Sequence, residues 1–170
     1  MIVNKVAESG IITLDLSTFL PDEKSILPFD LKPFLFRELI LREKDFREAL
    51  KNLDWDAYAG KHIALFCSAD AIIPVWAYML VAANLQWKSK SVFYGDTETL
   101  KQNLLIQNLT NSDISEFAGK RIVIKGCGET HIPESAYVMI TVRLAGIAKS
   151  VMYGEPCSTV PIIKNSIKTE

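Results

Sequence analysis

Residues 54–96 and 113–155 align without a gap when the first segment is shifted by 59 positions, and 15 of the 43 aligned positions are identical. The matches include Gly60/Gly119, Lys61/Lys120, Pro74/Pro133, Tyr78/Tyr137 and Tyr94/Tyr153. Agreement over this length without an insertion indicates an internal duplication. The fold must therefore contain the same structural unit twice.

Each copy predicts a strand, a helix and a second strand. Short runs rich in β-branched residues occupy 62–66 and 91–94 in the first copy, and 121–125 and 150–153 in the second. Between them, Pro74, Ala77, Tyr78, Val81 and Leu85 recur at helical spacing, and the second copy repeats the pattern. A proline is tolerated in the first helical turn because its missing N–H would have no partner there. Each copy is thus expected to be a βαβ unit.

The connection between the copies decides how they are expected to combine. Leu100, Leu104, Leu105 and Leu109 form a helical stripe, so residues 97–109 predict a helix that lets the second copy start parallel to the first. The pattern favours a three-layer α/β fold with one mainly parallel sheet, whose four core strands follow the order 2-1-3-4. The alternative is a ferredoxin-like α+β fold, which needs a short hairpin where this chain spends about 25 residues.

The length predicts a single domain, residues 1–170. The N-terminal addition contains an alternating strand pattern around Ile12, Leu14 and Leu16, and a helical pattern from Phe46 to Leu53. Between these lies an aromatic-rich segment, residues 20–41, interpreted as a cover over the sheet or a partner surface. The expected segments are an N-terminal addition (1–53), repeat one (54–96), a linking helix (97–112), repeat two (113–155) and a C-terminal tail (156–170).

Composition excludes several classes of protein. With 19 Lys and Arg against 20 Asp and Glu, the chain has no broad basic face, so a nucleic acid is not an expected partner. The longest apolar run, 71–85, has 15 residues and is too short for a membrane span. The N-terminus lacks the pattern of a secretory signal, so a cytoplasmic location is expected. Three cysteines in such a compartment do not predict a disulfide framework.

Candidate site residues follow from the predicted sheet. Ligands of open parallel sheets bind beyond the carboxyl ends of the strands, where the strand order reverses. The residues expected at this edge, with cysteines and carboxylates among them, are Cys67, Ser68, Asp70, Gly126, Cys127, Gly128, Glu129, Glu155, Cys157 and Ser158. They predict a crevice that binds a small molecule or a transition metal.

Cys127, His131 and Cys157 are the candidate metal ligands, because thiolate and imidazole groups suit zinc or iron. The alternatives are a nucleophilic or redox thiol, and cysteines that act only as small apolar residues. In "YGEPCSTVP", Pro156 and Pro161 are expected to hold an extended segment that presents Cys157, unless the segment is a plain exit strand. "GCGETHI" lacks the third glycine of a dinucleotide-binding loop.

The stretches "CSADAIIPVWAYML" and "KSVMYGEPCSTVP" resemble the DUF2480 family, an uncharacterised bacterial family known mainly from Bacteroidetes. The resemblance covers nearly the whole chain and implies a small cytoplasmic protein, and it assigns no catalytic residue. The leading hypothesis is a small-molecule or metal-binding protein. The alternative is a non-catalytic homo-oligomeric interaction module, and a homodimer is expected in either case.

Overall fold

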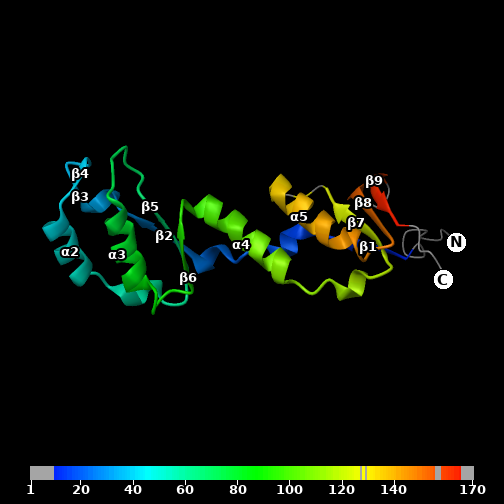
Figure 1. Cartoon of the computed structure of the whole chain (residues 1–170), viewed down its shortest axis with the longest axis horizontal. Coiled ribbons are helices and arrows are strands. Elements are labelled where there is room, and N and C mark those ends of the chain that lie inside the picture. The colour runs from blue at the N-terminus through cyan, green and yellow to red at the C-terminus, as the bar shows by residue number, and fades with distance from the viewer. Residues whose placement is uncertain (1–9, 127, 129, 156–157, 166–170) are drawn as a thin grey trace. The chain divides into compact units, whose positions relative to one another are not determined.

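A computed structural model describes residues 10–126, 128, 130–155 and 158–165 (Figure 1). The chain divides into two compact units. One runs from Pro21 to Asn103 and contains repeat one; it is called the repeat-one unit. The other combines the residues up to Leu20 with those from Leu104 onwards and contains repeat two; it is called the repeat-two unit. The single-domain organisation stays a prediction.

The repeat-one unit is built around three parallel strands in the order β2-β5-β6. Its elements are β2 (Ile26–Asp30), β3 (Leu35–Phe36), β4 (Ile40–Leu41), α2 (Glu43–Lys51), β5 (His62–Phe66), α3 (Val75–Leu85), β6 (Ser91–Tyr94) and the first turns of α4 (Thr97–Asn111). Short 3-10 helices span Glu23–Ser25, Lys32–Phe34 and Trp55–Tyr58. The strands β3 and β4 form a small antiparallel pair.

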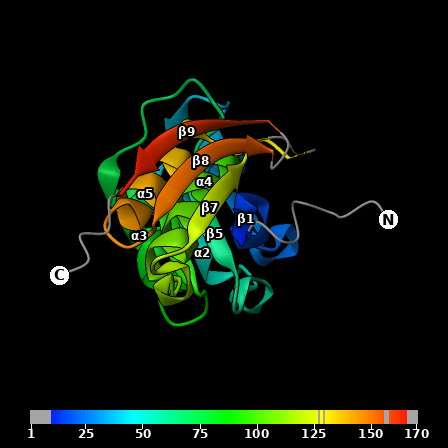
Figure 2. The same cartoon turned by 90° about the vertical axis from the view of Figure 1, so that its right-hand side faces the viewer.

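The repeat-two unit contains four strands in the order β1-β7-β8-β9, which lie side by side in Figure 2. Its elements are β1 (Ile11–Leu14), the last turns of α4, β7 (Arg121–Lys125), α5 (Glu134–Ala145), β8 (Ser150–Glu155) and β9 (Ser158–Lys164), with 3-10 helices at Leu16–Phe19 and Ser115–Phe117. The strands β1, β7 and β8 are parallel, and β9 pairs antiparallel with β8.

The helix of each repeat buries the stripe that the sequence predicts. In α5, Ala136, Ile140 and Leu144 are fully buried and pack with Ile122 and other core residues. The equivalent residues of α3 are fully buried in the core of the repeat-one unit. Both helices begin directly after a proline in an extended conformation. The expectation of an α/β protein with parallel strands is therefore confirmed.

The expected single sheet with the order 2-1-3-4 is wrong. The first strands of the two repeats, β5 and β7, lie in different sheets. Each is instead flanked by a strand from the N-terminal region, because β2 pairs with β5 and β1 pairs with β7. These two strands occupy the edges at which the repeats were expected to meet. A pattern of apolar residues identifies a strand but not its neighbour, which explains the error.

The two N-terminal strands are equivalent to each other. Ile11 lies opposite Arg121, and Ile26 lies opposite His62. Since Arg121 and His62 occupy the same position of the two repeats, the registers match Ile11 with Ile26 and therefore Asp15 with Asp30. The duplicated arrangement thus has three parallel strands, and an aspartate follows or ends the added strand in each unit.

Two further expectations are corrected, one for the N-terminal region and one for the C-terminal tail. Part of the aromatic-rich segment 20–41 is a strand of the sheet and not a cover, because Ile26–Asp30 forms β2, whose Phe29 is buried and has its ring centroid 5.8 Å from that of Trp55. Phe34 and Leu41 of the same segment pack against the core. Ser158–Lys164 forms β9, so the described part of the C-terminal tail is the exit strand that was the alternative interpretation. Pro156 lies outside the described residues. Pro161 lies where the register of β8 and β9 shifts, beside Met152. A proline fits a bulge because it cannot donate to the ladder.

Gly154 provides a test of the pairing between β8 and β9. Its φ is 126°, and a Cβ there would collide with the backbone carbonyl oxygen of Ser158, which the β8–β9 pairing holds in place. We expect Gly154→Ala to lower the free energy of unfolding by about 2 kcal/mol. Gly146→Ala is the matched control, since Gly146 has φ −82° and open space around it. Equal urea midpoints for the two variants would contradict this account of the β8–β9 pairing.

Candidate functional site

A crevice of about 520 Å³ opens at the carboxyl ends of β1 and β7 in the repeat-two unit. Asp15 follows β1, Lys125 ends β7, and Glu134 begins α5, and all three line the crevice. The crevice lies outside the carboxyl ends of these parallel strands. Open parallel sheets bind ligands at this edge.

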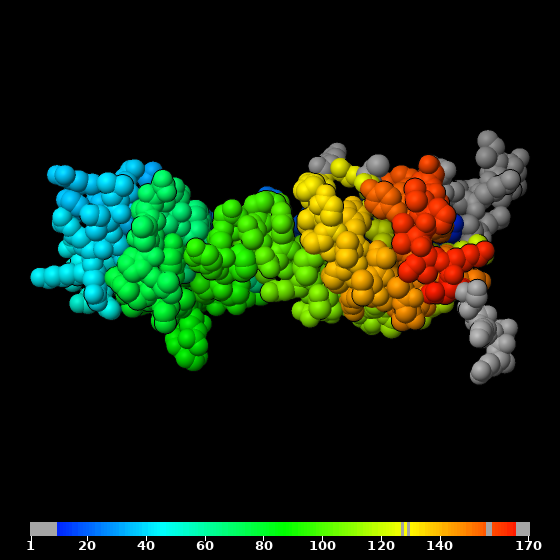
Figure 3. Space-filling model, turned by 45° about the horizontal axis from the view of Figure 1, so that its top comes forward, coloured from blue at the N-terminus to red at the C-terminus, as the bar shows by residue number. Residues whose placement is uncertain are grey.

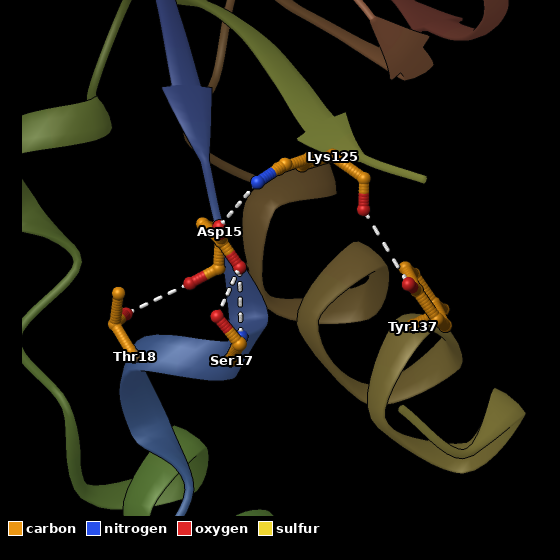
Figure 4. A network of polar contacts seen from close by, with 5 residues as sticks. All are labelled: Asp15, Ser17, Thr18, Lys125 and Tyr137. Atoms are coloured by element: carbon orange, nitrogen blue, oxygen red, sulfur yellow. Dashed lines mark hydrogen bonds and ion pairs between the residues drawn. The ribbon is translucent and has the colours of Figure 1, made fainter. Parts of the chain in front are cut away.

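Asp15 is the centre of a polar network drawn in Figure 4. Its Oδ1 accepts hydrogen bonds from the backbone N–H of Ser17 (3.0 Å) and from the Ser17 hydroxyl (2.6 Å). Its Oδ2 lies 2.9 Å from Nζ of Lys125. The hydroxyl of Thr18 donates to the Asp15 carbonyl oxygen at 2.7 Å. Asp15 makes both sets of side-chain contacts because one carboxylate oxygen caps the 3-10 helix Leu16–Phe19 and the other faces the ammonium group of Lys125.

These contacts keep Asp15 ionised. The hydrogen bond from the Ser17 hydroxyl and the contact with Lys125 lower the pKa of Asp15 to about 2 from a reference value of 3.8. Hydrogen bonds to the charged form of a carboxylate stabilise that form. The crevice therefore presents a fixed carboxylate beside an ammonium group at neutral pH.

Two tyrosines form the wall of the crevice on the side of α5 and β8. Their rings, Tyr137 and Tyr153, meet edge to face with centroids 5.7 Å apart. The Tyr137 hydroxyl donates to the carbonyl oxygen of Lys125 at 3.4 Å, and the Tyr153 hydroxyl donates to that of Gly126 at 3.5 Å. A Cβ on Gly126 would lie 2.7 Å from Cζ of Tyr153, so this close approach requires a glycine.

The repeat-one unit carries the same framework with different chemistry. Tyr78 and Tyr94 repeat the edge-to-face pair at 5.1 Å. Asp30, the counterpart of Asp15, accepts hydrogen bonds from the backbone N–H and the hydroxyl of Ser68, at 2.9 and 2.5 Å. Burial opposes ionisation of Asp30, but the hydrogen bonds from Ser68 and Lys32 outweigh it and lower the pKa.

Three of the polar groups that line the crevice occur only in repeat two. The position of Lys125 is held by Phe66 in repeat one, that of His131 by Ile72, and that of Glu134 by Val75. Lys125, His131 and Glu134 all line the crevice. Repeat one thus has apolar side chains at these three positions, and repeat two has charged and imidazole groups there.

The structure places the sequence-predicted site residues as follows. Gly126, Gly128 and His131 line the crevice of the repeat-two unit. Cys67, Ser68 and Asp70 follow β5 in the repeat-one unit, where Cys67 is half-buried and Asp70 is exposed. Cys127, Glu129 and Cys157 lie outside the described residues. The expected convergence of the three cysteines assumed that β5 and β7 are neighbours in one sheet, which they are not.

Glu155 and Ser158 face each other where β8 and β9 join. Oε1 of Glu155 is buried and receives no hydrogen bond from the part of the chain that the structure describes. The same described residues contain no group of three or more His, Cys, Asp or Glu side chains that could hold a metal ion. Of the proposed metal ligands, only His131 is described.

Sequence reasoning missed Asp15, Lys125 and the two tyrosines as site residues. A signal for Asp15 was present, because "ITLDLS" and "LPFDLK" repeat an Asp-Leu pair after a strand-like run at an offset of 15 residues. The leucines that follow the two aspartates, Leu16 and Leu31, are both buried. Their burial holds each aspartate at the carboxyl end of its strand.

The family model described as "Protein of unknown function (DUF2480)" matches residues 1–165. The chain belongs to this family. Neither the search of curated proteins nor that of solved structures found a match. No helix among the described residues is long and apolar enough to cross a membrane. Membership of the family assigns no chemistry to the crevice, so the residues that line it must supply the argument.

The network around Asp15 predicts a pH-dependent stability. Because its pKa is lower in the folded chain than the reference value, Asp15 stabilises the fold above about pH 4 and loses this effect as the pH falls towards 2. We expect Asp15→Asn to cost about 1 kcal/mol at neutral pH, after allowance for solvent screening, and the cost to vanish near pH 2. Urea unfolding across this range measures the difference. A cost that is independent of pH would contradict the assignment.

Proposed function

We propose that the crevice of the repeat-two unit binds a small polar molecule. The observation that carries the proposal is the replacement of Phe66, Ile72 and Val75 of repeat one by Lys125, His131 and Glu134 in repeat two. These three residues lie on two elements and a loop, yet all of them line one crevice. A solvated surface would not need charged groups gathered at the one edge where parallel sheets bind ligands.

The dimensions and lining of the crevice support this function. A volume of about 520 Å³ falls within the range of small-molecule sites. Apolar walls from Leu16, Ile132 and Val138 accompany the charged groups. Such a combination buries the body of a ligand while a few polar groups fix its orientation.

The charges of the lining indicate the chemistry of the ligand. Carboxylates of Asp15 and Glu134 and the ammonium group of Lys125 place both signs of charge at one edge, with the His131 ring beside them. A ligand that carries both hydrogen-bond donors and acceptors, such as an amino acid or a hydroxy acid, matches this lining better than a purely anionic or purely apolar one. The geometry of the crevice supports binding, and we assign no reaction.

Exchange of residues between the repeats tests the proposal. In thermal unfolding with a library of amino acids, hydroxy acids and sugars, we expect at least one compound to raise the Tm of the natural chain. A ligand at 100 times its Kd adds about 2.7 kcal/mol to the free energy of unfolding. The variant His131→Ile with Glu134→Val, which carries the repeat-one residues, should lose this shift.

The reciprocal variant, Ile72→His with Val75→Glu, is the matched control and should keep the shift. Both exchanges place residues that the other repeat already accommodates at the same positions, so neither should prevent folding. A library without any effect, or an equal effect on both variants, would contradict binding in this crevice.

The zinc or iron site of Cys127, His131 and Cys157 stays a prediction. Elemental analysis of protein purified without a chelator or an affinity tag tests it directly. We expect stoichiometric metal in the natural chain and its loss in His131→Ala, because neutral imidazole is a common metal ligand. Purified protein without metal would contradict the site.

A further inference from the structure

The two units differ in whether the last strand of the repeat is paired on its outer side. In the repeat-two unit, β8 lies between β7 and β9. Its counterpart in the repeat-one unit, β6, pairs with β5 on one side, and no described strand pairs with its other side. The duplication therefore shows a strand position that the chain fills in one unit and leaves open in the other.

The open side of β6 carries hydrogen-bonding groups of the backbone. The N–H groups of Ser91 and Gly95 donate to Lys61 and Leu65, at the start and end of the β5 pairing. Because successive residues of a strand alternate in direction, the N–H groups of Val92 and Tyr94 point to the open side. An edge of this kind is a template for another strand.

A groove of about 570 Å³ accompanies the open edge. Met79, Ala82 and Ala83 of α3 form one wall, and Ser91 and Val92 of β6 form the other. Met79 is 66% exposed. An exposed methionine beside two alanines gives an incoming strand an apolar surface on which to place its side chains.

The repeat-two unit shows what fits such a groove. There, residues of α5 (yellow to orange) and of β9 (red) lie on one face of the unit in Figure 3. Ile162 of β9 lines an apolar groove together with Val138 and Val142, which are the counterparts of Met79 and Ala83. Ile163 lies opposite Val151, the counterpart of Val92, and packs against the core. An antiparallel strand thus occupies this sheet edge and forms one side of an apolar groove along the helix.

We propose that the open edge of β6, with the groove beside α3, binds β6 of a second copy of the chain in antiparallel orientation. The two copies would form one continuous sheet of six strands, β2-β5-β6 followed by β6-β5-β2. Addition of a strand to a sheet edge is a common mode of protein recognition, in which backbone hydrogen bonds give affinity and side-chain pockets give specificity. A two-fold axis makes the contact self-complementary and closed.

Charge favours a second copy as the occupant. The strand is preceded by Lys90 and followed by Asp96, both exposed. Antiparallel pairing centred on Phe93 places Val92 of one copy opposite Tyr94 of the other, so that outward-pointing backbone groups meet. The same register places Lys90 of each copy opposite Asp96 of the other, whereas parallel pairing would align like charges. Complementary charges guide register and orientation at interfaces.

Sedimentation velocity of the full-length chain over a range of concentrations tests the proposal. We expect the natural chain to form a dimer, and Lys90→Glu to raise the dimer Kd roughly tenfold because it places like charges together twice across the two-fold axis. Lys149→Glu is the matched control. Lys149 is the exposed counterpart of Lys90, it lies where β9 already covers the edge, and its substitution should leave the Kd unchanged.

A second variant tests the backbone hydrogen bonds of the proposed interface. Val92→Pro removes an N–H that points to the open side and leaves the donors to β5 in place, so it should abolish the dimer while circular dichroism stays that of the natural chain. A natural chain that is monomeric up to its solubility limit would overturn the proposal. So would a dimer that Lys90→Glu leaves intact, or one that Lys149→Glu weakens to the same extent.

Discussion

The parallel pairing of an N-terminal strand with the first strand of each repeat is the constraint on which both units depend. A βαβ unit alone leaves one side of its first strand unpaired and one part of its core uncovered. Here β1 completes repeat two and β2 completes repeat one. Each added strand also delivers an aspartate to the carboxyl edge of its sheet, since Asp15 follows β1 and Asp30 ends β2. The candidate site is therefore a consequence of the same pairing that makes each unit stable.

The duplication gives both units the same arrangement of strands and helix, and differences at the carboxyl edge of the sheet give the repeat-two unit its charged groups. Both units retain the aspartate and an edge-to-face tyrosine pair. The two units differ at the strand end, the loop and the helix start around them, where repeat two has Lys125, His131 and Glu134. Substitutions at the carboxyl edge disturb the buried helix stripes little, because loops positioned by a rigid scaffold tolerate change more readily than a packed core. One unit could thus acquire a polar crevice while the other kept a hydrogen-bonded Asp30 and Ser68 at the equivalent place.

The two units also differ in strand pairing at the opposite edge of each sheet. In the repeat-two unit, β9 covers the outer edge of β8, and Pro161 sits at the irregular point of this pairing. The repeat-one unit has no equivalent segment, since the chain continues from β6 directly into α4. One sheet edge is thus closed within the chain, and the other is presented with an apolar helix face beside it. The crevice belongs to the repeat-two unit and the open edge to the repeat-one unit. The two units of one chain therefore have distinct roles in the proposed functions.

The sequence by itself determined the local elements and their repetition. Apolar spacing predicted the helices near 75–85 and 134–145, and the rule for parallel sheets placed Gly126, Gly128 and His131 at a carboxyl edge, where they line the crevice. Only the tertiary structure decided which strands are neighbours. That choice brings Asp15 to Lys125 across 110 residues of chain and separates β5 from β7 into different sheets. The physical reason is that helix periodicity and strand alternation are local properties, whereas strand pairing depends on non-local backbone hydrogen bonds and on core packing that a linear pattern does not encode.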